Sequence, residues 1–127
     1  ILEANFFNQT MPPWNELNLS WAQLKTLPNQ WASALAEWRG IYYIFDQSDG
    51  CGYVGSAYGG DNILGRWQNY AATGHGGNKR LKKRDPTSFQ FSILQRVSPD
   101  MDAADVIKLE ATWKTRLHTQ THGLNEN

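Results

Sequence analysis

Residues 40–56 read Gly-Ile-Tyr-Tyr-Ile-Phe-Asp-Gln-Ser-Asp-Gly-Cys-Gly-Tyr-Val-Gly-Ser. After the leading glycine, residues 41–45 are β-branched or aromatic, the polar residues at 46–50 favour a turn, and a second short run follows at 51–56. This pattern predicts a β-hairpin. The glycines on both sides of Tyr53 weaken a strand, and glycine is kept where a backbone or a ligand must approach closely.

The segments around the hairpin carry helical and strand periodicity. Apolar spacing and capping residues predict five helices, over about residues 20–26, 29–38, 62–72, 79–84 and 102–117. Alternating apolar and polar residues predict a third strand over 88–94. Residues 1–13 are interpreted as a linker or arm, so we assign 1–38 to a helical leader and 39–127 to the main domain.

The composition is that of one soluble domain. The chain has 127 residues, 40% of them hydrophobic, and its single cysteine, Cys51, excludes an internal disulfide and a cysteine-built metal site. The longest apolar run, 41–45, is far shorter than the ~20 residues of a membrane helix, so we expect a cytoplasmic protein without membrane contact. Because residue 1 is isoleucine, we expect a longer parent protein with a flanking domain outside this chain.

The charges are balanced in number but not in position. Residues 1–65 carry a net charge of −4 and residues 85–127 a net charge of −2, whereas residues 66–84 hold six basic and no acidic residues. Those six are Arg66, Lys79, Arg80, Lys82, Lys83 and Arg84. Such a block is typical of a surface that neutralises nucleic-acid phosphates. A solvated helix face is the alternative interpretation.

Four tryptophans lie in the leader, at Trp14, Trp21, Trp31 and Trp38. A platform on which bases stack is one interpretation of this cluster. Their helical spacing favours the other interpretation, in which they belong to the hydrophobic core.

The last predicted helix carries a carboxylate on its apolar side. At 100° per residue, Glu110 falls within the same arc as Val106 and Trp113. A buried carboxylate requires a cation, so Glu110 is expected to face a metal ion or a basic side chain. The alternative is an ion pair with Lys114 one turn later, which would draw Glu110 to the rim.

Two further pairs carry chemistry. Tyr42 and Tyr53 lie on opposite arms of the hairpin and are expected to project from one face, while Arg66 and Tyr70 are one helical turn apart and point the same way. An arginine fork suits phosphate oxygens, and a neighbouring phenol adds a further hydrogen bond. Ordinary packing is the alternative for each pair taken alone.

The ordered set Gly40-Ile41-Tyr42, Tyr53-Val54-Gly55, Arg66, Glu110 and Asn125 resembles the GIY-YIG nuclease superfamily. The resemblance covers residues 39–127. It implies a compact α+β domain with a central three-stranded antiparallel sheet flanked by helices, which cuts a phosphodiester bond with one divalent metal ion.

The resemblance also implies roles. Tyr42 would activate or orient the attacking water, Tyr53 would hold the phosphate or the solvent network, and Arg66 would contact the scissile phosphate. Glu110 would be the single metal-binding carboxylate, and Asn125 would support the site.

One position departs from the common pattern. Many members have histidine one turn after the arginine, whereas this chain has Tyr70, as in the excision-repair branch. His75, from the glycine-rich stretch 73–77, is a candidate to supply the imidazole or to contact phosphate.

The nucleophile poses a physical problem. A phenol with a pKa of about 10 is ionised to roughly one part in a thousand at neutral pH, so Tyr42 acts as a base only if the metal or Arg66 stabilises its phenolate. No lysine or arginine lies between Tyr42 and Tyr53, so we expect metal-bound water to share the work. With Glu110 as ligand, the site would be oxygen-rich, mostly hydrated and suited to Mg²⁺ or Mn²⁺.

These inferences favour an endonuclease that cleaves DNA. The basic residues Lys79, Arg80, Lys82, Lys83 and Arg84 are expected to bind the phosphate backbone beside the catalytic face. Two alternatives stay open: a weak or inactive nucleic-acid-binding module with the same fold, and a nuclease that acts on RNA.

Overall fold

The computed structural model describes residues 10–126, so residues 1–9 of the predicted arm lie outside it. A single antiparallel sheet has the strand order β1-β4-β2-β3. The strands are β1 (Asn18–Ser20), β2 (Arg39–Asp46), β3 (Cys51–Ala57) and β4 (Phe89–Val97). The α-helices are α2 (Trp21–Lys25), α3 (Asn29–Glu37), α4 (Ile63–Thr73) and α5 (Ala103–Leu117). The predicted α+β class is confirmed.

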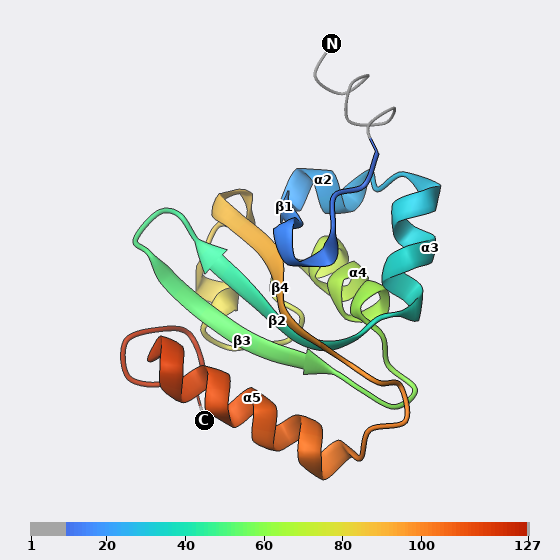
Figure 1. Cartoon of the computed structure of the whole chain (residues 1–127). Coiled ribbons are helices and arrows are strands. Elements are labelled where there is room, and N and C mark those ends of the chain that lie inside the picture. The colour runs from blue at the N-terminus through green and yellow to red at the C-terminus, as the bar shows by residue number, and fades with distance from the viewer. Residues whose placement is uncertain (1–9, 127) are drawn as a thin grey trace.

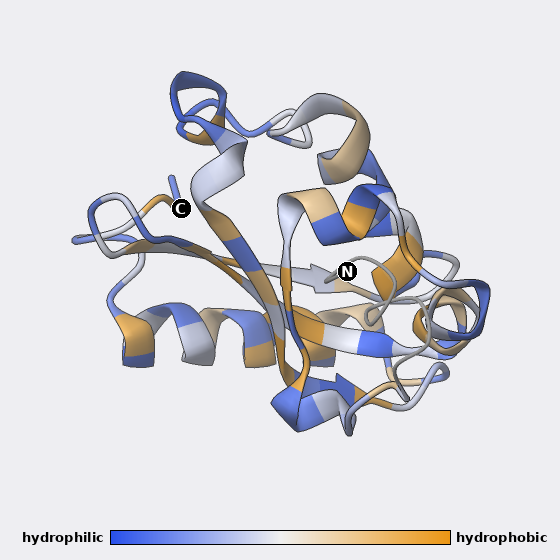
Figure 2. Cartoon of the chain, turned by 90° about the horizontal axis from the view of Figure 1, so that it is seen from above, coloured by the Kyte–Doolittle hydropathy of each residue, from blue (hydrophilic) through white to orange (hydrophobic). Residues whose placement is uncertain are grey.

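The sheet separates two helical layers. Helices α2, α3 and α4 cover one face and α5 crosses the other (Figure 1). Hydrophobic and hydrophilic positions alternate along α5, as Figure 2 shows, because only one side of this helix packs on the sheet. None of the described helices is long and apolar enough to cross a membrane.

The expectation of three strands is wrong, because the sheet has a fourth strand from the leader. β1 pairs antiparallel with β4, with Leu19 opposite Phe91. Leu19 is buried, so the strand covers the edge of β4 and adds to the core. β1 is three residues long and lies directly before α2, which leaves too little sequence for an alternating pattern to be visible.

The hairpin has the predicted form, and its register explains two glycines. Tyr42 lies opposite Gly55 and Ile44 opposite Tyr53, so the two tyrosines are diagonal neighbours on one face. A Cβ at Gly55 would overlap the hydroxyl of Tyr42, and a Cβ at Gly52 would overlap the ring of Tyr43. These glycines therefore leave room for tyrosine rings that cross over the neighbouring strand.

The leader tryptophans belong to the core, as their spacing predicted. Trp31 is buried among the side chains between the sheet and helices α2–α4, and Trp14, Trp21 and Trp38 pack partly buried against the same cluster. A smaller cluster under α5 contains Ile41, Val54 and Val106.

Local capping sets the bounds of α4. The helix begins after Asn62, whose side-chain oxygen accepts a hydrogen bond from the Gly65 N–H at 2.7 Å. It ends at Gly74, which has a φ of 80° in the left-handed region. The loop that follows returns the chain to the sheet on the same side as α4.

The basic segment 79–84 does not form the predicted helix. It contains a three-residue 3-10 turn, Leu81–Lys83, preceded by Asn78, whose side chain accepts from the Arg80 and Leu81 N–H groups. Arg84 is already extended, with φ −116° and ψ 157°. Pro86 follows closely and disfavours a helical conformation at the residue before it, so the turn cannot lengthen.

Candidate active site

An open pocket of about 240 Å³ lies where the end of β3 meets the start of α4 and the middle of α5. Its lining residues are Tyr53, Gly55, Ser56, Tyr58, Asp61, Arg66 and Glu110. Three predicted site residues, Tyr53, Arg66 and Glu110, therefore lie together although they are far apart in the sequence. β3 is the edge strand of the sheet, so α4 on one face and α5 on the other can both reach this pocket.

Tyr42 lies beneath the pocket instead of lining it. Its side chain is fully buried, and its hydroxyl is 2.9 Å from the hydroxyl of Tyr70. Nη2 of Arg66 donates to the Tyr42 hydroxyl at 3.4 Å. The edge of the Tyr42 ring also meets Trp67, with centroids 6.4 Å apart. The two phenols thus form a buried support under the arginine.

Burial dominates the acid–base properties of this support. It raises the pKa of Tyr42 to about 12, and the opposing effect of the Arg66 charge is smaller. Burial, followed by the proximity of Tyr42, raises the pKa of Tyr70 further still. Both phenols are therefore protonated at neutral pH.

Glu110 forms the ion pair that the sequence offered as the alternative interpretation. Its Oε2 lies 2.8 Å from Nζ of Lys114, the pair predicted one helical turn apart. Its Oε1 accepts a hydrogen bond from the hydroxyl of Ser56. The Glu110 side chain is 20% exposed and remains on the pocket wall, so the ion pair does not seal it from solvent.

Sequence analysis did not single out three lining residues of the pocket. Asp61 adds a second carboxylate, Tyr58 adds a phenol, and Ser56 adds a hydroxyl. Asp61 directly precedes Asn62, the residue that caps α4. One signal in the sequence could have indicated two of them. Ser56 and Tyr58 are at alternate positions after Val54, so they lie on the same side of the strand as it continues toward the pocket.

The oxygen donors of the pocket fit a hard divalent cation. Carboxylate oxygens of Glu110 and Asp61 are the ligands that Mg²⁺ and Mn²⁺ prefer. Within residues 10–126, no group of three or more His, Cys, Asp or Glu side chains is placed to enclose a metal. A cation here would therefore draw its remaining ligands from water and from the phosphate itself.

Asn125 acts on the strand and not on the pocket directly. Its Oδ1 accepts from the Val54 N–H at 2.8 Å and its Nδ2 donates to the Val54 carbonyl at 2.9 Å. The Leu124 N–H donates to the Gly52 carbonyl at 2.8 Å. The tail therefore runs along the free edge of β3 beside Gly52 and Val54.

His75 does not line the pocket. Its Nδ1 accepts a hydrogen bond from the Gly77 N–H at 2.8 Å, which ties the imidazole to its own loop. The loop instead covers Tyr70, because a Cβ at Gly76 would lie 2.6 Å from Cε1 of the Tyr70 ring.

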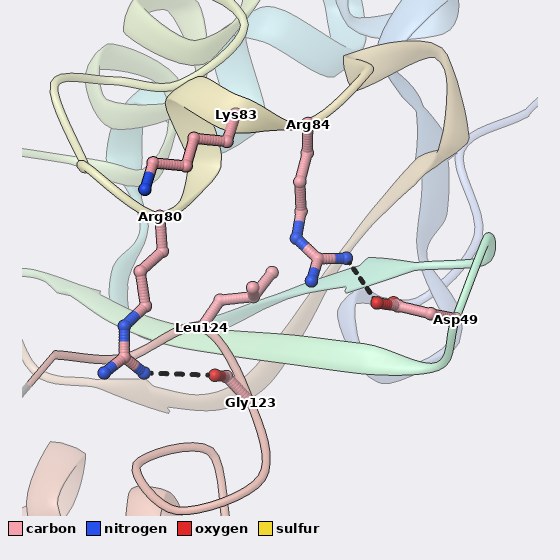
Figure 3. A pocket seen from close by; sticks show the side chains of 6 residues that line it. All are labelled: Asp49, Arg80, Lys83, Arg84, Gly123 and Leu124. Atoms are coloured by element: carbon pink, nitrogen blue, oxygen red, sulfur yellow. Dashed lines mark hydrogen bonds and ion pairs between the residues drawn. The ribbon is translucent and has the colours of Figure 1, made fainter.

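The basic block is divided between anchored and free side chains. Arg80 and Arg84 bond to the tail and to the hairpin turn, and they line a second pocket (Figure 3). Lys79, Lys82 and Lys83 are exposed.

Comparison with known proteins agrees with this geometry. A family model described as the GIY-YIG catalytic domain matches residues 39–125. The catalytic domain of the homing endonuclease I-TevI has a TM-score of 0.60 and 23% identity, over 70% of this chain and 98% of that chain. A mutant of the catalytic domain of intron endonuclease I-TevI gives a TM-score of 0.58 at 23% identity, covering 71% and 94% of the two chains. No curated protein shows a significant match to the chain. The family match begins at the first residue of β2, so β1, α2 and α3 precede it.

Proposed function

Because the chain belongs to the GIY-YIG family of nuclease catalytic domains, we propose that it is an endonuclease that hydrolyses phosphodiester bonds in DNA with one divalent metal ion. The observation that supports this most strongly is the open pocket that Tyr53, Arg66 and Glu110 line together. A guanidinium, a phenol and a carboxylate are the groups that this reaction requires in one place.

Arg66 is the residue that binds the scissile phosphate. Its planar fork matches phosphate oxygens and stabilises the negative charge that develops in the transition state. The hydrogen bond from its Nη2 to Tyr42 limits how the guanidinium can turn. We therefore assign Tyr42 as a positioning residue for Arg66.

Tyr53 is the phenol that contacts the attacking water. It lines the pocket, whereas Tyr42 is fully buried and its pKa of about 12 keeps it protonated at neutral pH. This assignment moves the water-orienting role from Tyr42, where the resemblance had put it, to Tyr53. Tyr70 supports Tyr42 from below through the bond between their hydroxyls.

Glu110 and Asp61 would hold the divalent ion. When bound, Mg²⁺ or Mn²⁺ supplies a Lewis acid that neutralises phosphate charge and lowers the pKa of a water. Ser56 fixes the rotamer of Glu110 by donating its hydroxyl to Oε1. The ammonium of Lys114 lies 2.8 Å from Oε2, so it would compete with a cation held through this oxygen.

The test is cleavage of supercoiled plasmid, single-stranded DNA and a matched RNA, each with Mg²⁺, with Mn²⁺ and with EDTA. We expect metal-dependent nicking or cutting of DNA that Glu110→Ala and Arg66→Ala abolish. Lys108→Ala, an exposed change on the same helix as Glu110, is the control and should leave cleavage intact. Preferential cleavage of RNA would mean that the protein is an endonuclease whose substrate is RNA and not DNA.

A non-cutting nucleic-acid-binding module is the second candidate. The ion pair between Lys114 and Glu110 favours it, because a carboxylate that is already neutralised is a weaker metal ligand. Binding that survives EDTA, together with no cleavage of any of the three substrates, would establish this candidate over the endonuclease.

A further inference from the structure

We propose that the pocket between Arg80, Lys83 and Arg84 is a discrete binding site for one backbone phosphate of a nucleic-acid strand, separate from the catalytic pocket. Its volume is about 540 Å³, and its lining residues are Asp49, Arg80, Lys83, Arg84, Gly123 and Leu124. None of these residues lines the catalytic pocket. Figure 3 shows both arginine side chains extending in the same direction from one short segment, with Leu124 between them.

Both arginines are anchored in a way that leaves most of each fork available. Nη1 of Arg80 donates to the carbonyls of Gly123, at 3.2 Å, and Asn125, at 2.8 Å. Nη1 of Arg84 lies 2.9 Å from Oδ2 of Asp46 and 2.7 Å from Oδ2 of Asp49. Each of these contacts to a carbonyl or carboxylate uses only the Nη1 atom of its arginine. Two pre-ordered guanidinium groups with free N–H donors suit bidentate binding of phosphate oxygens.

The charge balance of the pocket favours an anion. The carboxylates of Asp46 and Asp49 neutralise Arg84. Burial raises the pKa of Asp46, but hydrogen bonds from Ser48 and Arg84 outweigh it and hold this pKa below the usual range, and the bond from Arg84 lowers the pKa of Asp49. Arg80 is bound to neutral carbonyls, and neither it nor Lys83 forms an ion pair with any residue from 10 to 126. Positive charge is therefore left on Arg80 and Lys83, which lie together across the pocket from Arg84 and Asp49 (Figure 3).

The two pockets lie along the same strand edge. Leu124, in the wall of the basic pocket, is bonded to Gly52, whereas Gly55 and Ser56 line the catalytic pocket. Four residues of a β-strand span on the order of 13 Å. This length corresponds to about four nucleotides of one nucleic-acid strand, measured along a duplex axis. A nucleic-acid strand that follows the edge of β3 would therefore put one phosphate in each pocket. This placement rests on the proposed function, whereas anion binding by the basic pocket does not.

Two neighbouring lysines provide a matched test. Lys82 and Lys83 are both exposed and both belong to the same 3-10 turn, but only Lys83 lines the pocket. Binding of a labelled DNA oligonucleotide is measured by fluorescence anisotropy over a series of salt concentrations, in EDTA so that no cleavage occurs. We expect Lys83→Ala to weaken binding about fivefold and to reduce the salt slope by about one, and Lys82→Ala to change both much less.

Equal losses in the two variants would show a diffuse basic surface and overturn the proposal, as would no loss in either. Inorganic pyrophosphate distinguishes the source of the phosphate. If pyrophosphate competes with DNA, and Lys83→Ala removes this competition, the site is supported. If pyrophosphate binds but Lys83→Ala leaves the affinity for DNA unchanged, the pocket is not a nucleic-acid site. These binding measurements are made in EDTA and do not depend on cleavage. If Lys83 contributes to DNA binding but the protein cleaves none of the three substrates in the cleavage test, the phosphate site stands and only the proposed endonuclease activity is contradicted.

Discussion

The hydroxyls of Tyr42 and Tyr70 lie 2.9 Å apart in a buried pair, and Arg66 reaches the same Tyr42 hydroxyl from the pocket side. Burial raises the pKa of both phenols, so the pair is a neutral hydrogen-bonded support at physiological pH. Tyr70 therefore packs in the core and holds the Tyr42 hydroxyl in place beneath Arg66.

Alkaline pH should destabilise the protein through Tyr42. Its pKa is about 12 in the folded state and about 10 when unfolded. Below about pH 10 both states are protonated and the stability is constant; between about 10 and 12 the unfolded state releases the proton first, so the free energy of unfolding falls. The full effect is on the order of 3 kcal/mol. Urea denaturation from about pH 9 to pH 11 measures roughly the first half of this loss. The free energy of unfolding of Tyr42→Phe should fall less steeply with pH than that of the parent.

The cleavage rate should fall even when Arg66 is replaced by lysine. Removing a group that stabilises transition-state charge lowers the rate by roughly 100- to 1000-fold, and we expect this for Arg66→Ala. Arg66→Lys should recover only part of the loss, because an ammonium cannot bind phosphate and the Tyr42 hydroxyl with one planar fork. Single-turnover cleavage rates measure both. Full recovery by lysine would mean that only the charge matters.

Lys114 should oppose metal binding. Its ammonium lies 2.8 Å from Oε2 of Glu110, so Lys114→Met should free that oxygen. A close charge pair contributes on the order of 1 kcal/mol, so the affinity for Mn²⁺ should rise about fivefold. Electron paramagnetic resonance of free Mn²⁺ reports this without any cleavage assay. Lys108→Met is the matched control, because Lys108 lies on the same helix and is exposed. A fall in affinity would identify Lys114 as a support that orients Glu110.

Asn125 should matter for stability more than its position near the end of the chain suggests. It is 2% exposed and satisfies both the N–H and the carbonyl of Val54. Leaving one buried polar group unsatisfied costs about 1–3 kcal/mol, so Asn125→Ala should lower the free energy of unfolding by roughly 2–4 kcal/mol. Asn125→Asp should also destabilise, because a carboxylate accepts from the N–H but cannot donate to the carbonyl. Glu126→Ala, an exposed neighbour, should be neutral in the same denaturation series.

The parts of the fold that could be predicted are those with local patterns. The hairpin, α4 and α5 carry clear periodicity, and α4 also has a capping residue. The motif residues Tyr53 and Arg66 line one pocket. β1 could not be found because a three-residue strand has no period.

Other features depend on partners that are distant in sequence. The burial of Tyr42 follows from α4 packing Trp67 across it, and the anchoring of Arg84 requires the carboxylate of Asp46, 38 residues earlier. Asp61 is next to the helix cap in sequence, and only the fold places it in the same pocket wall as Glu110. Spacing along the chain contains no information about any of these contacts.

The tail that bonds to Gly52 and Val54 has a further effect on how the molecule behaves in solution. An uncovered edge strand is a template on which a second copy can add its own strand, and this is a common start of aggregation. By occupying the outer N–H and carbonyl groups of β3, Leu124 and Asn125 block such intermolecular pairing. A chain shortened before residue 124 should therefore become prone to self-association as well as less stable.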